Sequence, residues 1–173
     1  MHSIPVPTQF RPRFALVTAG LACLLAVFPP TVQAAEGGLK VIRTFTGWRD
    51  AASFKRISEY FGGNENPSHQ TVLRTHSDQR AGYYFLVRAA NEGTPAAVQI
   101  KLQLVAPTEP KLRTFSFSTK LKSGDTVLNL GLTGKDWPDA KANPVAWKLD
   151  FVAADGRIMA SDKSYLWEKP AAK

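Results

Sequence analysis

The sequence predicts an all-β fold, a two-layer antiparallel β-sandwich with one short amphipathic helix near the start of the mature chain. Two observations lead to this fold class. Apolar residues recur at every second position in several segments, which is the period of a strand with one buried face. Turn-forming residues, mostly glycine, proline, aspartate and serine, separate these segments at short intervals, and this spacing is typical of sandwiches.

The beginning of the chain has the pattern of a Sec-type signal peptide. Arg11 and Arg13 precede an uncharged apolar run over residues 14–28. This run is shorter than a membrane-spanning helix, which needs about 20 residues, but its length suits the core of a signal peptide. The small side chains of Val32 and Ala34 stand at the two positions that a signal peptidase reads. We therefore expect cleavage after Ala34 and export to the periplasm or the medium.

Removal of the signal peptide, residues 1–34, leaves a mature chain, residues 35–173, whose length corresponds to a single domain. No membrane span is predicted after cleavage, and retention as an N-terminal anchor is the alternative interpretation. Cys23 is the only cysteine and lies inside the apolar run, whereas the lipidated cysteine of a lipoprotein opens into a polar linker. The mature chain therefore has no thiol for a disulfide, a nucleophile or a metal site.

Strands are expected wherever the alternation is sustained. Asp155 and Gly156 lie between two such runs and predict a tight hairpin, and residues 92–95 and 123–125 have the composition of turns. The expected strands cover residues 39–45, 70–75, 81–91, 98–104, 114–118, 128–132, 145–151 and 158–167.

The stretch over residues 81–91 is apolar on both of its faces, which predicts a central strand covered by the opposite sheet on one side and by the helix or a long loop on the other. A phenol at the start of this strand can also hydrogen-bond a neighbouring corner. The residues of the two faces are Tyr83, Phe85 and Val87, and Tyr84 and Leu86.

The rhythm of residues 81–91 resembles the penultimate strand of fibronectin type III domains, with aromatic residues, an arginine, Ala-Ala-Asn and a glycine turn. In that family one final strand follows, whereas here the chain continues to residue 173 with several further strand signals. The resemblance is confined to this stretch, and the fold expectation is an immunoglobulin- or fibronectin-like architecture rather than membership of the family.

One segment, residues 50–61, has a different period. Asp50 can cap the start of a helix there, and Gly62 and Gly63 can end it in a left-handed conformation. The apolar positions at helical spacing are Phe54, Ile57 and Phe61. We expect a short amphipathic helix that packs its aromatic stripe on an edge or end of the sandwich.

The composition restricts the partners. The chain carries 22 lysines and arginines against 14 aspartates and glutamates, and the basic residues of the mature part are dispersed rather than clustered. A dispersed surplus of positive charge favours solubility. Nucleic acid is not predicted as a partner, because an exported protein does not meet it. An acidic envelope polymer or an anionic lipid is the lesser interpretation of this charge.

Candidate catalytic residues are few. His69 and His76 are seven positions apart, so a regular strand between them would place them on opposite faces, and neither a metal site nor a cofactor is predicted. The carboxylate pairs that a hydrolase could use are Glu59 with Glu65 and Asp136 with Asp139. Beside glycine and proline these residues are ordinary turn formers, so an enzyme is not predicted.

Trp137 is the candidate binding residue, with Asp136 and Lys135 as its polar rim. Pro138 disfavours helical geometry at Trp137, which predicts a ring exposed on an extended loop; a ring that folds back as a cap is the alternative. The predicted function is an exported, non-catalytic sandwich that binds a protein of the cell envelope or helps to assemble an envelope structure. The alternatives are a carbohydrate-binding module that binds an envelope glycan through exposed aromatics and a small carboxylate-based hydrolase.

Overall fold

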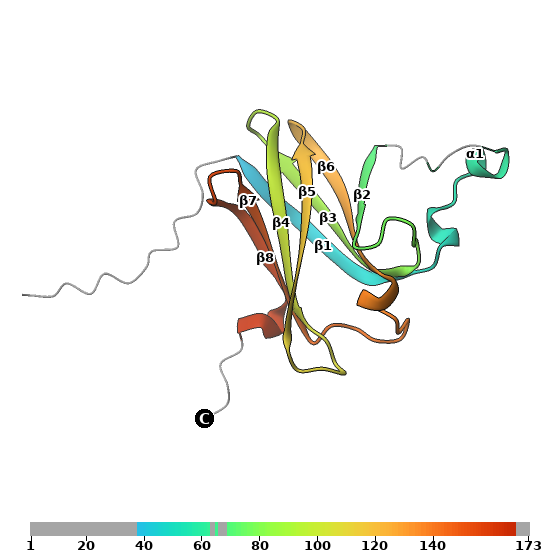
Figure 1. Cartoon of the computed structure of the whole chain (residues 1–173). Coiled ribbons are helices and arrows are strands. Elements are labelled where there is room, and N and C mark those ends of the chain that lie inside the picture. The colour runs from blue at the N-terminus through green and yellow to red at the C-terminus, as the bar shows by residue number, and fades with distance from the viewer. Residues whose placement is uncertain (1–37, 63–64, 66–68, 169–173) are drawn as a thin grey trace, which may run out of the picture. The chain divides into compact units, whose positions relative to one another are not determined.

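Two β-sheets make up most of the protein (Figure 1). The structure, a computed structural model, describes residues 38–62, 65 and 69–168, and the predicted signal peptide and Gly63 lie outside them. The protein is mostly β-structure in two antiparallel-rich sheets, so the predicted all-β sandwich is confirmed at this level. Within the described ranges, no helix is long and apolar enough to cross a membrane.

Sheet A has the strand order β1-β3-β6-β2. Its long strands β1, β3 and β6 are antiparallel, and the short β2 runs parallel to β6. A β-bulge at Ile42 interrupts the pairing of β1 with β3. The bounds are β1 Leu39–Arg49, β2 Gln70–Arg74, β3 Gly82–Asn91 and β6 Gly124–Thr133.

Sheet B has the strand order β5-β4-β7-β8 and is antiparallel throughout. Gly156, with a φ of 85°, turns the chain between β7 and β8, which confirms the predicted hairpin. Predicted strand 158–167 ends earlier than expected, at Lys163, and a 3₁₀ turn, η3 (Tyr165–Glu168), follows it. The bounds are β4 Ala96–Val105, β5 Leu112–Leu121, β7 Ala146–Ala153 and β8 Ile158–Lys163.

The core lies between the sheets and uses the alternation that the sequence shows. Every second residue of the central strands points inward, since successive side chains of a strand alternate between its faces. Trp147 is partly buried and contacts Phe85 edge-on, with 5.5 Å between ring centres. The fully buried residues of these strands include Phe85, Val87, Ile100, Leu102, Leu104, Leu128, Leu130, Leu132, Leu149 and Phe151.

β3 is a central strand, as predicted, and Tyr84 shows that its beginning is covered on both faces. Its side chain lies on the outer face of sheet A, yet Tyr84 is 1% exposed. Phe54 covers its ring at 4.5 Å between ring centres. The Tyr84 hydroxyl donates a hydrogen bond of 2.7 Å to the carbonyl of Arg80, so the phenol pins the corner that leads into β3.

The predicted amphipathic helix over residues 50–61 is wrong. The segment contains a 3₁₀ turn, η1 (Ala52–Phe54), and a one-turn helix, α1 (Ile57–Tyr60). Lys55 separates them in an extended conformation, with ψ of 120°. Asp50 does cap the start, because its carboxylate accepts the Ser53 N–H at 2.8 Å, and Gly62 has the predicted left-handed φ of 87°. Since only Phe54 reaches the sheet, the apolar stripe has no common surface to pack on.

Candidate functional site

The loop after β6 places Trp137 in the core, so the expectation of an exposed ring is wrong. Trp137 is 3% exposed, its Nε1 donates to the carbonyl of Ala142 at 3.2 Å, and its ring centre lies 5.1 Å from that of Tyr83. Gly134 adopts a φ of 57° in the turn η2 (Gly134–Asp136), which immediately precedes Trp137. Pro138 keeps Trp137 non-helical, as predicted, but the ring folds inward as a cap.

The other two residues of that predicted site lie on the surface around the cap. The Asp136 carboxylate is 3.1 Å from Nε2 of His76 and 3.6 Å from a guanidinium nitrogen of Arg113. The first pair is close without the alignment of a hydrogen bond, since His76 Nε2 is buried and lacks one. Lys135 is exposed. Whether Lys135 and Asp136 contact a partner stays a prediction.

The carboxylates of one predicted pair, Glu59 and Glu65, are both bound by arginine. Glu59 and Glu65 converge on Arg80, at 2.6 and 3.4 Å. Hydrogen bonding from Arg80 lowers the pKa of Glu59, and hydrogen bonding from Arg74 lowers the pKa of Glu65. Among the residues that the structure covers, no three histidine, cysteine, aspartate or glutamate side chains come together as a metal site would require.

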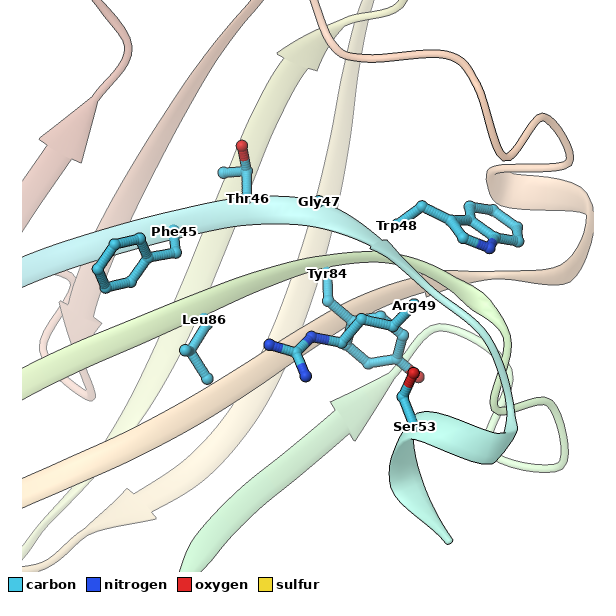
Figure 2. Close-up of a pocket in the computed structure, with 8 residues that line it drawn as sticks. All are labelled: Phe45, Thr46, Gly47, Trp48, Arg49, Ser53, Tyr84 and Leu86. Carbon is cyan, nitrogen blue, oxygen red and sulfur yellow. The ribbon is translucent and has the colours of Figure 1, made fainter.

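A different surface, the outer face of sheet A, is hollowed. Two adjoining cavities of ≈ 300 Å³ and ≈ 240 Å³ lie on it and share Arg49 and Ser53. Figure 2 shows Phe45, Leu86 and Arg49 on the side of the sheet that bears the first cavity, with Thr46 pointing to the opposite side. Val72, Gln70 and Asn129 line the second cavity.

Four arginines lie in or near this hollowed region of the outer face, and we call Arg43, Arg49, Arg56 and Arg88 the arginine face. Arg49 and Arg56 line the cavities directly. Arg43 and Arg88 are paired across β1 and β3 and lie two residues from Phe45 and Leu86, so they project from the same face. Arg43 confirms this placement, since its guanidinium lies 5.3 Å from the Phe45 ring centre.

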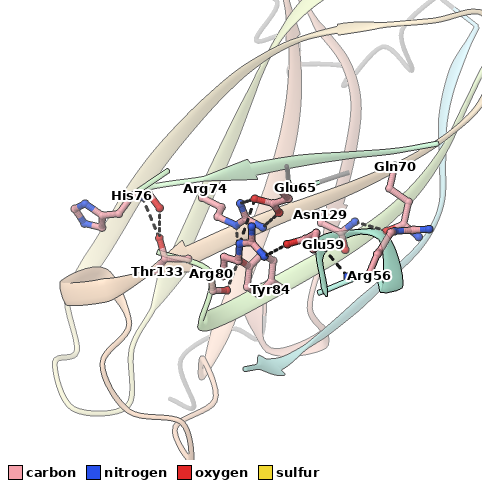
Figure 3. Close-up of polar contacts among 10 residues, drawn as sticks. All are labelled: Arg56, Glu59, Glu65, Gln70, Arg74, His76, Arg80, Tyr84, Asn129 and Thr133. Atoms are coloured by element: carbon pink, nitrogen blue, oxygen red, sulfur yellow. Dashed lines mark hydrogen bonds and ion pairs between the residues drawn. The ribbon is translucent and has the colours of Figure 1, made fainter. Parts of the chain in front are cut away.

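A network of polar contacts holds the β1–β2 segment on this face (Figure 3). Arg74, with a side chain 7% exposed, binds both carboxylate oxygens of Glu65, at 3.0 and 2.5 Å. Its Nε donates to the Tyr84 hydroxyl at 2.9 Å, and its guanidinium lies 5.1 Å from the Phe54 ring centre. Bidentate, charge-assisted pairs of this kind fix geometry as well as contributing energy. Tyr84, Phe54 and Glu65, which line the two cavities, are therefore held in fixed positions.

Sequence reasoning did not find the arginine face. Its signal is visible in the alternation of Arg43, Phe45, Gly47 and Arg49 along one strand, and in Arg88 two positions after Leu86. The missing information was that β1 pairs with β3, because that pairing is what brings the two strands' arginines side by side.

Comparison with known proteins adds no family: no family model, no curated protein and no solved structure matches the chain.

Proposed function

We propose that the chain is an exported, non-catalytic binding protein that uses the arginine face to bind another protein of the cell envelope. The contact segment of that partner is acidic, with an apolar residue that enters the cavity beside Phe45 and Leu86. The fold in this proposal is an immunoglobulin- or fibronectin-like sandwich.

The observation that carries the proposal is the direct pairing of Arg43 with Arg88 across β1 and β3. Both are exposed, and neither has an ion-pair partner among the described carboxylates. Like charges directly opposite each other destabilise a sheet, and departures from such local rules concentrate at functional sites. An acidic partner would remove this repulsion.

The strand order supports the immunoglobulin-like part of the proposal. In that fold strands A, B, E and D form one sheet and C, F and G the other. Here β1, β3 and β6 stand in the places of A, B and E, and β4, β7 and β8 in those of C, F and G. The place of D is taken by β2, which precedes β3 in the chain and runs parallel to its neighbour.

The lowered pKa of Glu59 and Glu65 supports a non-catalytic role. A glycosidase needs one carboxylic acid whose pKa is raised, so that it still carries a proton when the bond breaks. Arginine hydrogen bonds stabilise the ionised form of both groups instead.

The position of the aromatic rings favours a protein partner over a glycan. A carbohydrate-binding surface needs neighbouring exposed rings, whereas on the arginine face Phe45, at 49%, is the one exposed ring among the described residues. Trp137 is buried and Trp147 packs against the core, and the exposed rings of Tyr60 and Phe61 lie on α1 and directly after it. An exposed ring beside cations suits an acidic, partly apolar peptide.

The test is a capture experiment with a pair of charge-matched variants. The immobilised protein is exposed to the envelope fraction of the producing cells and, separately, to a glycan array. We expect Arg43→Gln/Arg88→Gln to lose the captured protein, and the control Lys120→Gln/Lys122→Gln, which removes two exposed lysines elsewhere, to keep it. Capture should weaken with increasing salt, because exposed charges are screened.

A stability measurement completes the test. Removing the Arg43–Arg88 repulsion should leave the free protein as stable or more stable, by about 0.2–1 kcal/mol. Two outcomes would refute the arginine face as the site. The first is that Arg43→Gln/Arg88→Gln captures the same protein as wild type, and the second is that wild type and this variant bind the same glycan equally well. Lys135→Gln is the arm that tests the loop site predicted from the sequence.

A further inference from the structure

The segment between β1 and β2 carries an apolar tip that the described residues leave uncovered. We define the tip as Lys55, Arg56, Ile57, Tyr60 and Phe61. The side chains of its three apolar residues are among the most exposed in the protein: Ile57 is 79%, Tyr60 65% and Phe61 86% exposed. In Figure 1, α1 stands away from both sheets. Isolated exposed apolar residues are ordinary, but a cluster marks an interaction site.

The charges around the tip are of one sign. Lys55 and Arg56 are exposed, and the Lys55 ammonium lies 4.2 Å from the centre of the Tyr60 ring. Glu59 shares the single turn of α1 but is directed back to Arg80, at 2.6 Å, with its side chain 5% exposed. The carboxylate is thereby withdrawn and neutralised, and the tip presents apolar and cationic groups.

The base of the tip is fixed to sheet A. Phe54 packs on Tyr84 at 4.5 Å between ring centres, and Asp50 closes the turn before it by accepting the Ser53 hydroxyl at 2.6 Å. The Arg80–Glu59 pair holds α1 itself. The apolar side chains are consequently presented outward from a constrained base.

We propose that the tip docks the protein on an anionic lipid bilayer. Exposed apolar residues flanked by lysine and arginine are the pattern of peripheral segments that enter the headgroup region, where binding grows with the buried apolar area and with attraction to anionic lipids. Tyrosine is also enriched at this interface. Ile57 and Phe61 enter the acyl boundary, Tyr60 lies at the headgroup level, and Lys55 and Arg56 bind lipid phosphates. The tip shares Arg56 with the arginine face, and its other residues are separate from the contact proposed for that face.

Sedimentation with vesicles tests the proposal, using the exported form of the protein. Vesicles contain equal parts of phosphatidylglycerol and phosphatidylcholine, or phosphatidylcholine alone. We expect binding to the anionic vesicles, and at least a tenfold loss of the partition constant for Ile57→Ser/Phe61→Ser. The matched control is Tyr165→Ser/Leu166→Ser, which removes two apolar residues that are 90% and 47% exposed in η3 and should bind like wild type. Unchanged melting temperatures of both variants show that the fold is intact.

An environment-sensitive probe gives a second readout. The mature chain, residues 35–173, contains no cysteine, so Tyr60→Cys and Tyr165→Cys each introduce its only thiol, to which a nitrobenzoxadiazole dye is attached. The dye at position 60 should brighten with anionic vesicles and be quenched by brominated acyl chains, and the dye at position 165 should not. A tip variant that binds vesicles as well as wild type, or a dye at position 60 that stays in water, would overturn lipid docking. Lipid docking would also be overturned if wild type does not bind vesicles and Ile57→Ser/Phe61→Ser no longer captures the envelope protein, because the tip would then be a protein contact. Vesicle binding retained by Arg43→Gln/Arg88→Gln separates this proposal from the function proposed above.

Discussion

The ring of Tyr84 lies directly against the backbone of Gly131 on the neighbouring strand. The two residues are paired across β3 and β6, and a β-carbon placed on Gly131 would come 2.7 Å from Cζ of Tyr84. On its other side Tyr84 is paired with Gly47 of β1, where a β-carbon would meet nothing within 4 Å. The ring therefore leans toward β6, and the space beside Gly47 is part of the first cavity of the outer face.

Substituting the two glycines should have unequal effects. Gly131→Ala forces a methyl group against a ring that cannot withdraw, because the Tyr84 hydroxyl is bound to Arg74 and to the Arg80 carbonyl. We expect it to lower the free energy of unfolding by about 1–3 kcal/mol, as for other overpacked sites. Gly47→Ala should stay within about 0.5 kcal/mol of wild type. Urea unfolding measures both, and equal losses would contradict the one-sided packing of the ring.

Trp137→Ala should destabilise the protein without removing its partner. Deleting a buried tryptophan costs about 3–5 kcal/mol, and Trp137 is buried in the core, where its Nε1 donates to the Ala142 carbonyl. Tyr165→Ala, at a residue 90% exposed, is the control and should change stability by less than about 0.5 kcal/mol. A stable Trp137→Ala protein that has lost its captured partner would restore the binding site predicted from the sequence.

Acid should loosen the attachment of the β1–β2 segment. Hydrogen bonding from Arg74 lowers the pKa of Glu65 below its ordinary value of 4.5. A group with a lowered folded-state pKa contributes stability that is complete above the unfolded-state pKa and is lost as the pH falls through the folded-state value. The difference in unfolding free energy between wild type and Glu65→Gln should therefore be constant from pH 7 to about 5 and shrink below pH 4.5.

The measurement for this prediction is urea unfolding of wild type and Glu65→Gln at a series of pH values. Glu92→Gln changes an exposed glutamate that forms no salt bridge with the residues that the structure describes, and it serves as the control. A difference between wild type and Glu65→Gln that does not change between pH 7 and pH 3 would show that the ion pair with Arg74 does not carry the effect.

Export should remove the first 34 residues. The apolar run over residues 14–28 and the small residues Val32 and Ala34 predict a mature protein that begins at Ala35. Intact-mass spectrometry of the protein isolated from the envelope or the medium measures this start. A mass that retains Met1 would indicate an uncleaved anchor, and an acylated Cys23 would indicate a lipoprotein.

Much of the fold could be predicted from local pattern alone. The strand period is a property of the extended backbone, in which side chains alternate faces wherever the segment later pairs. The alternation of Leu128, Leu130 and Leu132 therefore predicted an inward-facing strand, and all three are fully buried. Likewise, Gly156 predicted a hairpin because a positive φ is a local requirement of the turn.

Local sequence pattern was therefore enough to predict most of the strands, several turns and which strand faces are apolar. It could not predict what covers each apolar group, because that depends on how the segments come together in the folded chain. Phe54 packs on Tyr84, whereas Ile57 and Phe61 stay exposed. The helical spacing of these residues does not reveal whether a complementary apolar face lies nearby. Trp137 lies in the core because partners for it exist there: its ring packs against Tyr83, and its Nε1 donates to the Ala142 carbonyl. The arginine face also arose only on pairing, since Arg43 and Arg88 are distant in sequence and meet through the register of β1 with β3.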